Sequence, residues 1–311
     1  MTVDRMKQLI ATAALLAMAL VPASALAEGL WPLEFADQIR EEGGRVSFVF
    51  GANRPFPQCH ASTVAETSDG GLVAAWFGGK AEKDDDVGIW ASTLDGKKWS
   101  APVIVAKLNN TPHWNPVLFR DETGEIHLFF KVGPEIPFWK TYWMHSKDGK
   151  TWSDPEELVA GDKGGRGPVK NKAIILADGA WLAPASTEHE GWNAFADRSM
   201  DHGKTWSRSE NFEIDKSKLK GKGVIQPTFW ESAPGKVHAM LRSTGGQIWR
   251  SDSDDSGKTW SPIYDTGLPN NNSGFDAVQL KDGRLLLVYN PVGGNWSDRT
   301  PLDLAVSKDN G

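Results

Sequence analysis

Several features are scarce or missing in this 311-residue sequence, and each absence excludes a class of protein. The single cysteine, Cys59, excludes an internal disulfide. Lys and Arg number 34 against 40 Asp and Glu, so no basic stripe points to a nucleic-acid partner. No metal-ligand spacing, phosphate-binding loop or Ser-His-Asp motif stands out, and we expect no metal and no cofactor. No segment after residue 27 keeps a 3.6-residue apolar period, which argues against a helical fold.

Long apolar runs are equally scarce, and the one that exists lies at the N-terminus. Arg5 and Lys7 precede an apolar stretch at residues 9–21, and the small-residue pattern Ala-Leu-Ala follows at residues 25–27. The stretch is too short to cross a bilayer as a helix. We therefore predict a signal peptide at residues 1–27, export to the periplasm or the outside of a bacterial cell, and no membrane span.

What the sequence has in abundance is one short phrase, Ser-x-Asp-x-Gly-x-Thr-Trp. Full or shortened copies end at tryptophans 99, 152, 206 and 260, in steps of 53, 54 and 54 residues, and a fifth copy begins at Ser307. Asp accepts local backbone hydrogen bonds, Gly takes a positive φ, and Trp is large enough to anchor a turn. The phrase therefore predicts a structural turn rather than a repeated active site. The aspartates that would close these turns are Asp95, Asp148, Asp201, Asp255 and Asp309.

Short apolar runs recur between the copies of this phrase. Each follows an Asp-Gly, Thr-Gly or Pro-Gly turn signal, a pattern typical of β-hairpins. The runs lie at residues 72–77, 126–130, 178–183, 237–241 and 285–289. About four strands in each repeat of roughly 40 to 50 residues is typical of a propeller blade. We predict an all-β propeller at residues 46–311, after a lead-in at residues 28–45.

The repeated phrase resembles the Asp box, or bacterial neuraminidase repeat, of the sialidase superfamily. The stretch from residue 57 to residue 90 looks like a sialidase-like bacterial branch, and the resemblance covers essentially all of the chain after residue 27. It implies a six-bladed propeller, of which the C-terminal blade would be incomplete here. It also implies a glycoside hydrolase of the exo-α-sialidase class, with an acidic glycan such as a terminal sialic acid as its ligand. The oligomeric state stays open.

The resemblance also assigns residues to the substrate carboxylate, which sialidases hold with three arginines. A guanidinium suits this role because its planar fork binds a carboxylate bidentately. By position, the second arginine corresponds to Arg242 and the third to Arg299. The position of the first arginine holds His60 instead. A histidine there can contact the carboxylate or act as an acid or base near neutral pH.

The family's acid/base is an aspartate in the loop after the first apolar strand, which here is residues 80–86. A carboxylate whose pKa is raised by neighbouring negative charge can serve as a general acid. Asp86 enters the next strand and has the most fixed position, and Asp85 is the second candidate. Lys80 and Glu82 are assigned to substrate binding. The alternatives are a solvated acidic loop or a cation site.

Two positions depart from the family pattern. Gln226, which lies 16 residues before Arg242, replaces the glutamate that activates a tyrosine nucleophile, and glutamine cannot accept a proton. The tyrosine itself would lie beyond Gly311. The alternatives are therefore another acidic-glycan hydrolase or a polysaccharide lyase that uses His60 as acid or base, and a non-catalytic glycan-binding propeller, which would tolerate Gln226.

Three polar clusters lie outside the repeated phrase, at residues 113–116, 166–172 and 270–274. In a propeller the loops between strands gather at one face, where such side chains can bind a sugar while a tryptophan stacks on its apolar face. The alternative is that they are ordinary turn residues.

Overall fold

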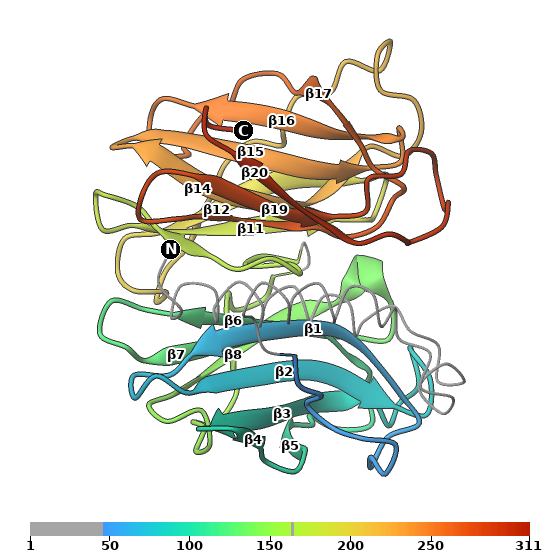
Figure 1. Cartoon of the computed structure of the whole chain (residues 1–311), viewed down its shortest axis with the longest axis vertical. Coiled ribbons are helices and arrows are strands. Elements are labelled where there is room, and N and C mark those ends of the chain that lie inside the picture. The colour runs from blue at the N-terminus through green and yellow to red at the C-terminus, as the bar shows by residue number, and fades with distance from the viewer. Residues whose placement is uncertain (1–45, 163–164) are drawn as a thin grey trace. The chain divides into compact units, whose positions relative to one another are not determined.

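The computed structural model describes residues 46–162 and 165–311, and its regular structure there is β apart from one 3-10 helix, Ile136–Phe138 (Figure 1). The predicted all-β class is confirmed. The signal peptide predicted at residues 1–27 and the lead-in at residues 28–45 lie outside the described residues. Within the described ranges, no helix combines the length and the apolar character that a membrane crossing requires.

The strands form five antiparallel sheets, in which consecutive strands pair in chain order except in sheet 1, where the last strand pairs with the third. Sheet 1 contains β1 (Gln58–Glu66), β2 (Leu72–Gly79), β3 (Gly88–Asp95), β4 (Lys98–Trp99) and β5 (Val103–Ala106). Sheet 2 contains β6 (His113–Arg120), β7 (Ile126–Val132), β8 (Lys140–Ser146) and β9 (Glu156–Glu157). Sheet 3 contains β10 (Ile174–Ile175), β11 (Trp181–Thr187), β12 (Asn193–Ser199) and β13 (Ser207–Arg208).

The last two sheets follow the same plan. Sheet 4 contains β14 (Val224–Ala233), β15 (Lys236–Ser243), β16 (Gln247–Ser253) and β17 (Tyr264–Pro269). Sheet 5 contains β18 (Asp276–Gln279), β19 (Leu285–Tyr289) and β20 (Asp303–Ser307). The predicted apolar runs are strands β2, β7, β11, β15 and β19, each of which is a central strand, paired on both sides. Consecutive residues of these strands are buried, so both faces are covered there, which explains why they read as continuous apolar runs.

The chain divides into two compact units, each with its own core. The N-terminal unit runs to Pro134 and includes Tyr142–Glu156, and the C-terminal unit comprises Glu135–Thr141 and Glu157–Gly311. In the N-terminal unit β1 lies against β6, and apolar side chains of β2, β6 and β7 form one buried cluster. In the C-terminal unit β14 lies against both β11 and β18, and its core draws on sheets 3 and 4. The first strands β1, β6, β14 and β18 thus pack on a neighbouring sheet of their own unit, as first strands do between blades of a propeller.

The Asp box is a hydrogen-bonded turn in this structure. Asp201 accepts the Thr205 backbone N–H at 2.8 Å and its hydroxyl at 2.6 Å, and Ser199 Oγ accepts the Gly203 N–H at 2.8 Å. The Trp206 indole N–H donates to the Gly203 carbonyl at 2.8 Å. The hydrogen bonds from Thr205 lower the pKa of Asp201 to about 2. The carboxylate is therefore ionised and occupied within its own turn, which leaves it no catalytic part.

The first copy of the phrase closes differently. Asp95 pairs with Lys98 in the short hairpin between β3 and β4, with Gly96 at φ 60° in the turn. Thr93 stands where the other copies have serine, and the Trp99 indole N–H donates to Ser47 Oγ at 3.1 Å. The repeat period therefore identifies the turn, while the residue at its first position decides which hydrogen bonds close it.

Replacing Ser253 by alanine should lower the free energy of unfolding by about 1–3 kcal/mol. Ser253 Oγ accepts the N–H of the buried Gly257 at 3.0 Å, and alanine would leave this donor without its acceptor. Urea unfolding measures the change. Ser217→Ala is the matched control, because this exposed hydroxyl only donates within a surface turn. A Ser253→Ala protein as stable as the wild type would contradict the role of the Asp box in stability.

Candidate functional site

Each of the five repeats carries one non-glycine residue with positive φ at or just before its first strand. Three of these first strands, β1, β6 and β14, have a β-bulge at this point. Such backbone persists only where the surroundings enforce it, it is concentrated at functional sites, and a bulge redirects the local side chain. The repeat architecture therefore supplies one redirected side chain per sheet. These residues are Ala61 (φ 53°), Asn115 (φ 40°), Lys170 (φ 69°), Gln226 (φ 52°) and Asn272 (φ 62°).

In the C-terminal unit, two of these redirected side chains hold Arg242. The arginine lies on β15, and its Nη1 donates to Gln226 Oε1 at 2.8 Å. Its Nε donates to Asn272 Oδ1 at 3.0 Å, and the guanidinium carbon lies 5.3 Å from the ring centroid of Trp192. Both hydrogen-bond partners are neutral amides. They fix the orientation of the guanidinium and add no negative charge beside it.

A second arginine lies close enough to Arg242 for their charges to repel each other. The pKa of Arg242 is lowered to about 10, chiefly by burial and then by the positive charge of Arg299, while Glu188 opposes the shift. Burial also lowers the pKa of Arg299 and raises that of Glu188. Two desolvated guanidinium groups beside one partly buried carboxyl group form a site with excess positive charge. A carboxylate ligand would relieve this repulsion and can accept bidentate hydrogen bonds.

An exposed aromatic ring adjoins this pair of charges. Trp296 is 66% exposed, and the guanidinium carbon of Arg299 lies 5.5 Å from its ring centroid. The loop is anchored by Asn290, whose amide donates to the Arg299 carbonyl at 2.9 Å, and by Asn295, which accepts a hydrogen bond from Asn272 at 2.8 Å. An exposed indole beside a cation suits a ligand with one apolar face and one charged group.

The N-terminal unit contains the acidic loop. Both carboxylate oxygens of Asp86 lie 3.2 Å from the backbone nitrogen of Lys80, which closes the loop between β2 and β3. The Lys107 ammonium donates to the carbonyl of Asp85 and, at 3.0 Å, to that of Thr111. Glu82, Asp85 and Asp86 are all exposed. The loop therefore holds Asp86 in a fixed position while its carboxylate stays open to solvent.

His60 lies on β1, directly before the bulge. Its Nδ1 accepts the backbone N–H of Ala61 at 3.1 Å, and its ring stacks on Phe77 at a centroid distance of 5.7 Å. Because Nδ1 is the acceptor, the proton of the neutral ring lies on Nε2. The structure thus brings Gln226, Arg242 and Arg299 together in one unit, and Lys80 and Asp86 in the other.

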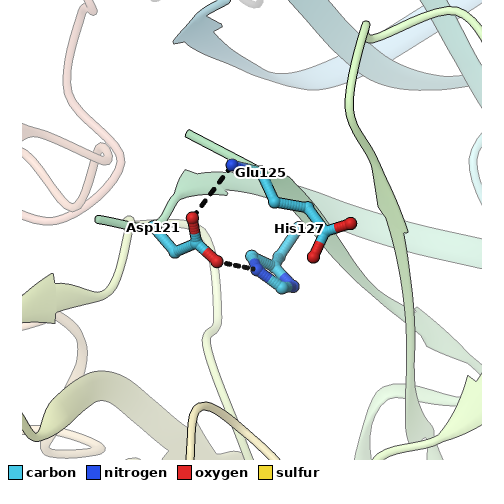
Figure 2. A group of neighbouring side chains, drawn as sticks. All are labelled: Asp121, Glu125 and His127. Atoms are coloured by element: carbon cyan, nitrogen blue, oxygen red, sulfur yellow. Dashed lines mark hydrogen bonds and ion pairs between the residues drawn. The ribbon is translucent and has the colours of Figure 1, made fainter. Parts of the chain in front are cut away.

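One group of side chains has the composition of a metal site. Asp121, Glu125 and His127 offer ligand atoms within 4.8 Å of one another (Figure 2). Asp121 Oδ1 already accepts the N–H groups of Thr123 and Glu125 at 2.9 Å each, and Oδ2 accepts His127 Nε2 at 3.0 Å. These bonds close the hairpin between β6 and β7. We assign the group a structural role, because a cation would have to displace the bonds that form the turn.

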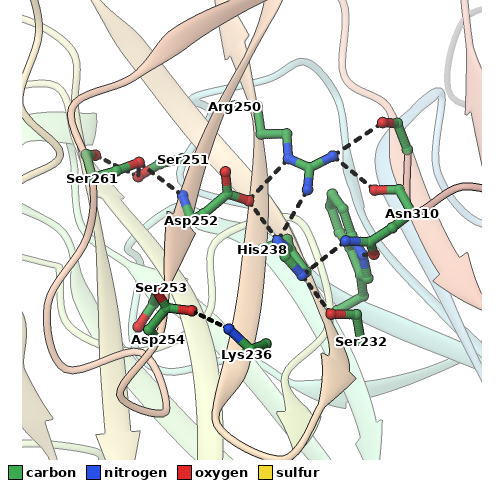
Figure 3. Close-up of polar contacts among 12 residues, drawn as sticks. Ser232, Lys236, His238, Arg250, Ser251, Asp252, Ser253, Asp254, Ser261 and Asn310 are labelled. Atoms are coloured by element: carbon green, nitrogen blue, oxygen red, sulfur yellow. Dashed lines mark hydrogen bonds and ion pairs between the residues drawn. The ribbon is translucent and has the colours of Figure 1, made fainter.

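The structure also joins a serine, a histidine and an aspartate that no sequence motif revealed. Ser232 Oγ lies 2.7 Å from His238 Nε2, and Asp252 bonds Nδ1 of the same ring (Figure 3). The Trp230 indole can only donate, so Asn310 Oδ1 must accept it, at 2.7 Å, and the Asn310 amide then donates to Nε2 at 3.0 Å. The Ser232 hydroxyl and the Asn310 amide therefore both point at the lone pair of His238 Nε2. We assign this network a structural role: it holds the fifth Asp box, which begins at Ser307, against sheet 4.

Comparison with known proteins places these features in a family. The BNR repeat-like domain matches residues 70–311, and the chain belongs to this family. Its fold is that of the sialidase-like β-propellers, as the resemblance predicted. No curated protein matches the chain.

Three solved structures illustrate the likeness. The Hadza microbial sialidase Hz136 aligns with a TM-score of 0.68 and 18% identity, over 82% of this chain and 57% of that protein. A protein of unknown function from Dyadobacter fermentans DSM 18053 aligns at 0.63 and 19%, over 83% and 85%. The Trypanosoma rangeli sialidase, in complex with 2,3-difluorosialic acid as a covalent intermediate, aligns at 0.63 and 17%, over 82% and 47%. The chain thus spans about half the length of these sialidases, and the likeness shows the fold.

Proposed function

We propose that this protein is an exported glycoside hydrolase of the exo-α-sialidase class that acts on terminal acidic sugars such as sialic acid. The observation that carries the proposal is the pair of desolvated guanidinium groups, Arg242 and Arg299, whose charges repel each other. We further propose that the five sheets belong to a six-bladed propeller. The fold shared with solved sialidases supports both proposals.

The shape of the ligand follows from the groups around these arginines. A planar carboxylate matches the guanidinium fork, and the exposed ring of Trp296 offers a surface for the apolar face of a sugar ring. The neutral partners Gln226 and Asn272 leave the charge of Arg242 for the ligand. A sugar acid satisfies these requirements better than a neutral sugar does.

A second candidate function is a glycan-binding propeller without catalysis. The observation that favours it is the bond between Arg242 and Gln226, because an amide accepts a hydrogen bond but cannot take up a proton. In this function the arginines hold the acidic sugar as proposed, and no bond is cleaved. The two functions share their ligand and differ only in turnover.

The wild-type protein should bind sialic acid at least about tenfold more tightly than its methyl ester, because the ester removes the charge that the two guanidinium groups recognise. Calorimetric titration measures both affinities, and release of sugar from sialosides and uronic-acid glycans measures turnover. The methyl ester is the matched control, since it keeps the ring and hydroxyl groups. Equal affinity for acid and ester would rule out a carboxylate site. Binding without turnover would favour the glycan-binding function.

A further inference from the structure

We infer that Lys170 is a third cationic residue of the site formed by Arg242 and Arg299, and that it strengthens the binding of anionic sugars. The inference rests on the proposed function, because it adds a residue to the same site. In sheet 3 Lys170 is the redirected residue with positive φ, as Gln226 is in sheet 4 and Asn272 is in sheet 5. Those two residues hold Arg242 directly, and the repeat places Lys170 in the equivalent position.

A chain of hydrogen bonds links Lys170 to Arg242 on one side. The Lys170 ammonium donates to Asn171 Oδ1 at 2.8 Å. The amide nitrogen of the buried Asn171 donates in turn to the carbonyls of Gln226 and Pro227, at 3.1 Å and 2.9 Å. The side-chain oxygen of Gln226 then accepts a hydrogen bond from Arg242. The bulge of β14, which includes the Gln226 that orients the arginine, thus also anchors Asn171, and Asn171 holds the Lys170 ammonium.

On the other side, Lys170 lies along the loop that follows Asn272. A Cβ atom at Gly274 would come within 2.2 Å of Lys170 Cε, so the lysine stem occupies the space that any other residue would fill. The ammonium also donates to the Phe275 carbonyl at 2.9 Å. The stem is enclosed between the two polar clusters at residues 166–172 and 270–274. Part of the residue stays exposed to solvent, while the ammonium itself is held by Asn171 and Phe275.

The charges around Lys170 favour an added anion. The pKa of Lys170 is lowered to about 8, chiefly by burial; Asp276 opposes this shift, and the positive charges of Arg242 and Lys172 add to it. Asp276 is itself shared, because Lys172 bonds it at 2.8 Å and Thr228 bonds it at 2.7 Å. Its negative charge is therefore mostly compensated by another lysine. A ligand carboxylate would supply the missing negative charge.

The first test measures binding of sialic acid at pH 7. Lys170→Gln, which keeps a hydrogen-bond donor but loses the charge, should weaken binding by about tenfold or more. Gly274→Ala should weaken it as well, because the added methyl group displaces the lysine stem. Lys236→Gln is the matched control, since this lysine lies at the opposite end of β15 from Arg242 and pairs with Asp254. Unchanged affinity in Lys170→Gln would overturn the inference.

The second test varies pH. Because deprotonation removes the charge, wild-type affinity should fall by up to about tenfold between pH 7 and pH 9, as a group with a pKa near 8 loses its proton. Lys170→Arg should show no such fall, since a guanidinium stays protonated. A pH dependence that persists in Lys170→Arg would contradict the assignment.

The third test needs no ligand and separates the inference from the proposed function. Competitive labelling with acetic anhydride, followed by mass spectrometry, gives the pKa of individual lysines. The pKa of Lys170 should rise in Arg242→Gln, because the neighbouring positive charge is gone, and that of Lys236 should stay unchanged. No rise would overturn the inference. A rise without binding of sialic acid or glucuronic acid would retain Lys170 in an anion site and reject the proposed ligand.

Discussion

Replacing Arg242 by methionine is expected to weaken the binding of sialic acid by about 2–5 kcal/mol, which is roughly 30-fold to several thousand-fold. The guanidinium is desolvated and oriented by Gln226 and Asn272, so a ligand carboxylate gains a charge-assisted bond that solvent screens little. Arg299→Met should have an effect of the same kind. Calorimetric titration at fixed ionic strength measures both.

Stability should move in the opposite direction from binding. The lowered pKa of Arg242 means that the folded state disfavours its charge, and Arg299 contributes to that penalty. Arg242→Met should therefore melt at the same temperature as the wild type or higher. Arg284→Met is the matched control, because this arginine pairs with Asp282 in the hairpin between β18 and β19 and should not affect binding. Binding that survives in both Arg242→Met and Arg299→Met would reject the proposed site.

Replacing Asp86 by asparagine is expected to lower turnover by about 10²- to 10⁴-fold, the usual loss when a general acid is removed. Asparagine keeps an oxygen that can accept the Lys80 N–H, so the loop between β2 and β3 should keep its form. The substrate affinity should change little, because the residue acts on the leaving oxygen rather than on the carboxylate. Release of sugar from a sialoside, measured with the melting temperature, tests both expectations.

One control variant and one alternative candidate complete this test. Asp84→Asn removes an exposed carboxylate from the same loop and should leave turnover unchanged. Asp85→Asn tests the second candidate, whose backbone carbonyl is held by Lys107. Wild-type turnover in Asp86→Asn would exclude it as the acid. If the wild type binds acidic sugars without cleaving any, and Asp86→Asn binds equally well, the protein is a glycan-binding propeller.

Part of this site could be predicted because its residues belong to one hairpin. Gln226 and Arg242 lie on the paired strands β14 and β15, where Ile225 is the register partner of Arg242. Counting 16 residues back from Arg242 placed Gln226 at the position of the family's glutamate, and in the structure the two side chains are hydrogen-bonded. Predictions of this kind succeed when both residues lie on paired strands of one hairpin.

Contacts made between sheets could not be predicted in this way. Asn272 and Trp296 take part in the same site from sheet 5 and the loop after β19, and no sequence motif shows that they lie beside Arg242 and Arg299. The two polar clusters at residues 166–172 and 270–274 were visible as composition, with sugar binding and ordinary turns both open as their roles. Only the packing of the sheets shows that Lys170 lies against Gly274.

The sequence by itself determined the all-β class, the repeat and its turns, because these depend on neighbours within a few residues and on a regular period. The resemblance of the repeated phrase to the sialidase family also indicated the arginines. The packing of the sheets decides that Arg242 and Arg299 lie close enough for their charges to repel each other and that Gln226 and Asn272 hold Arg242. It also decides that Ser232, His238 and Asp252 share a network. Burial and charge at these places depend on residues far apart in the chain, whose distances no sequence pattern encodes.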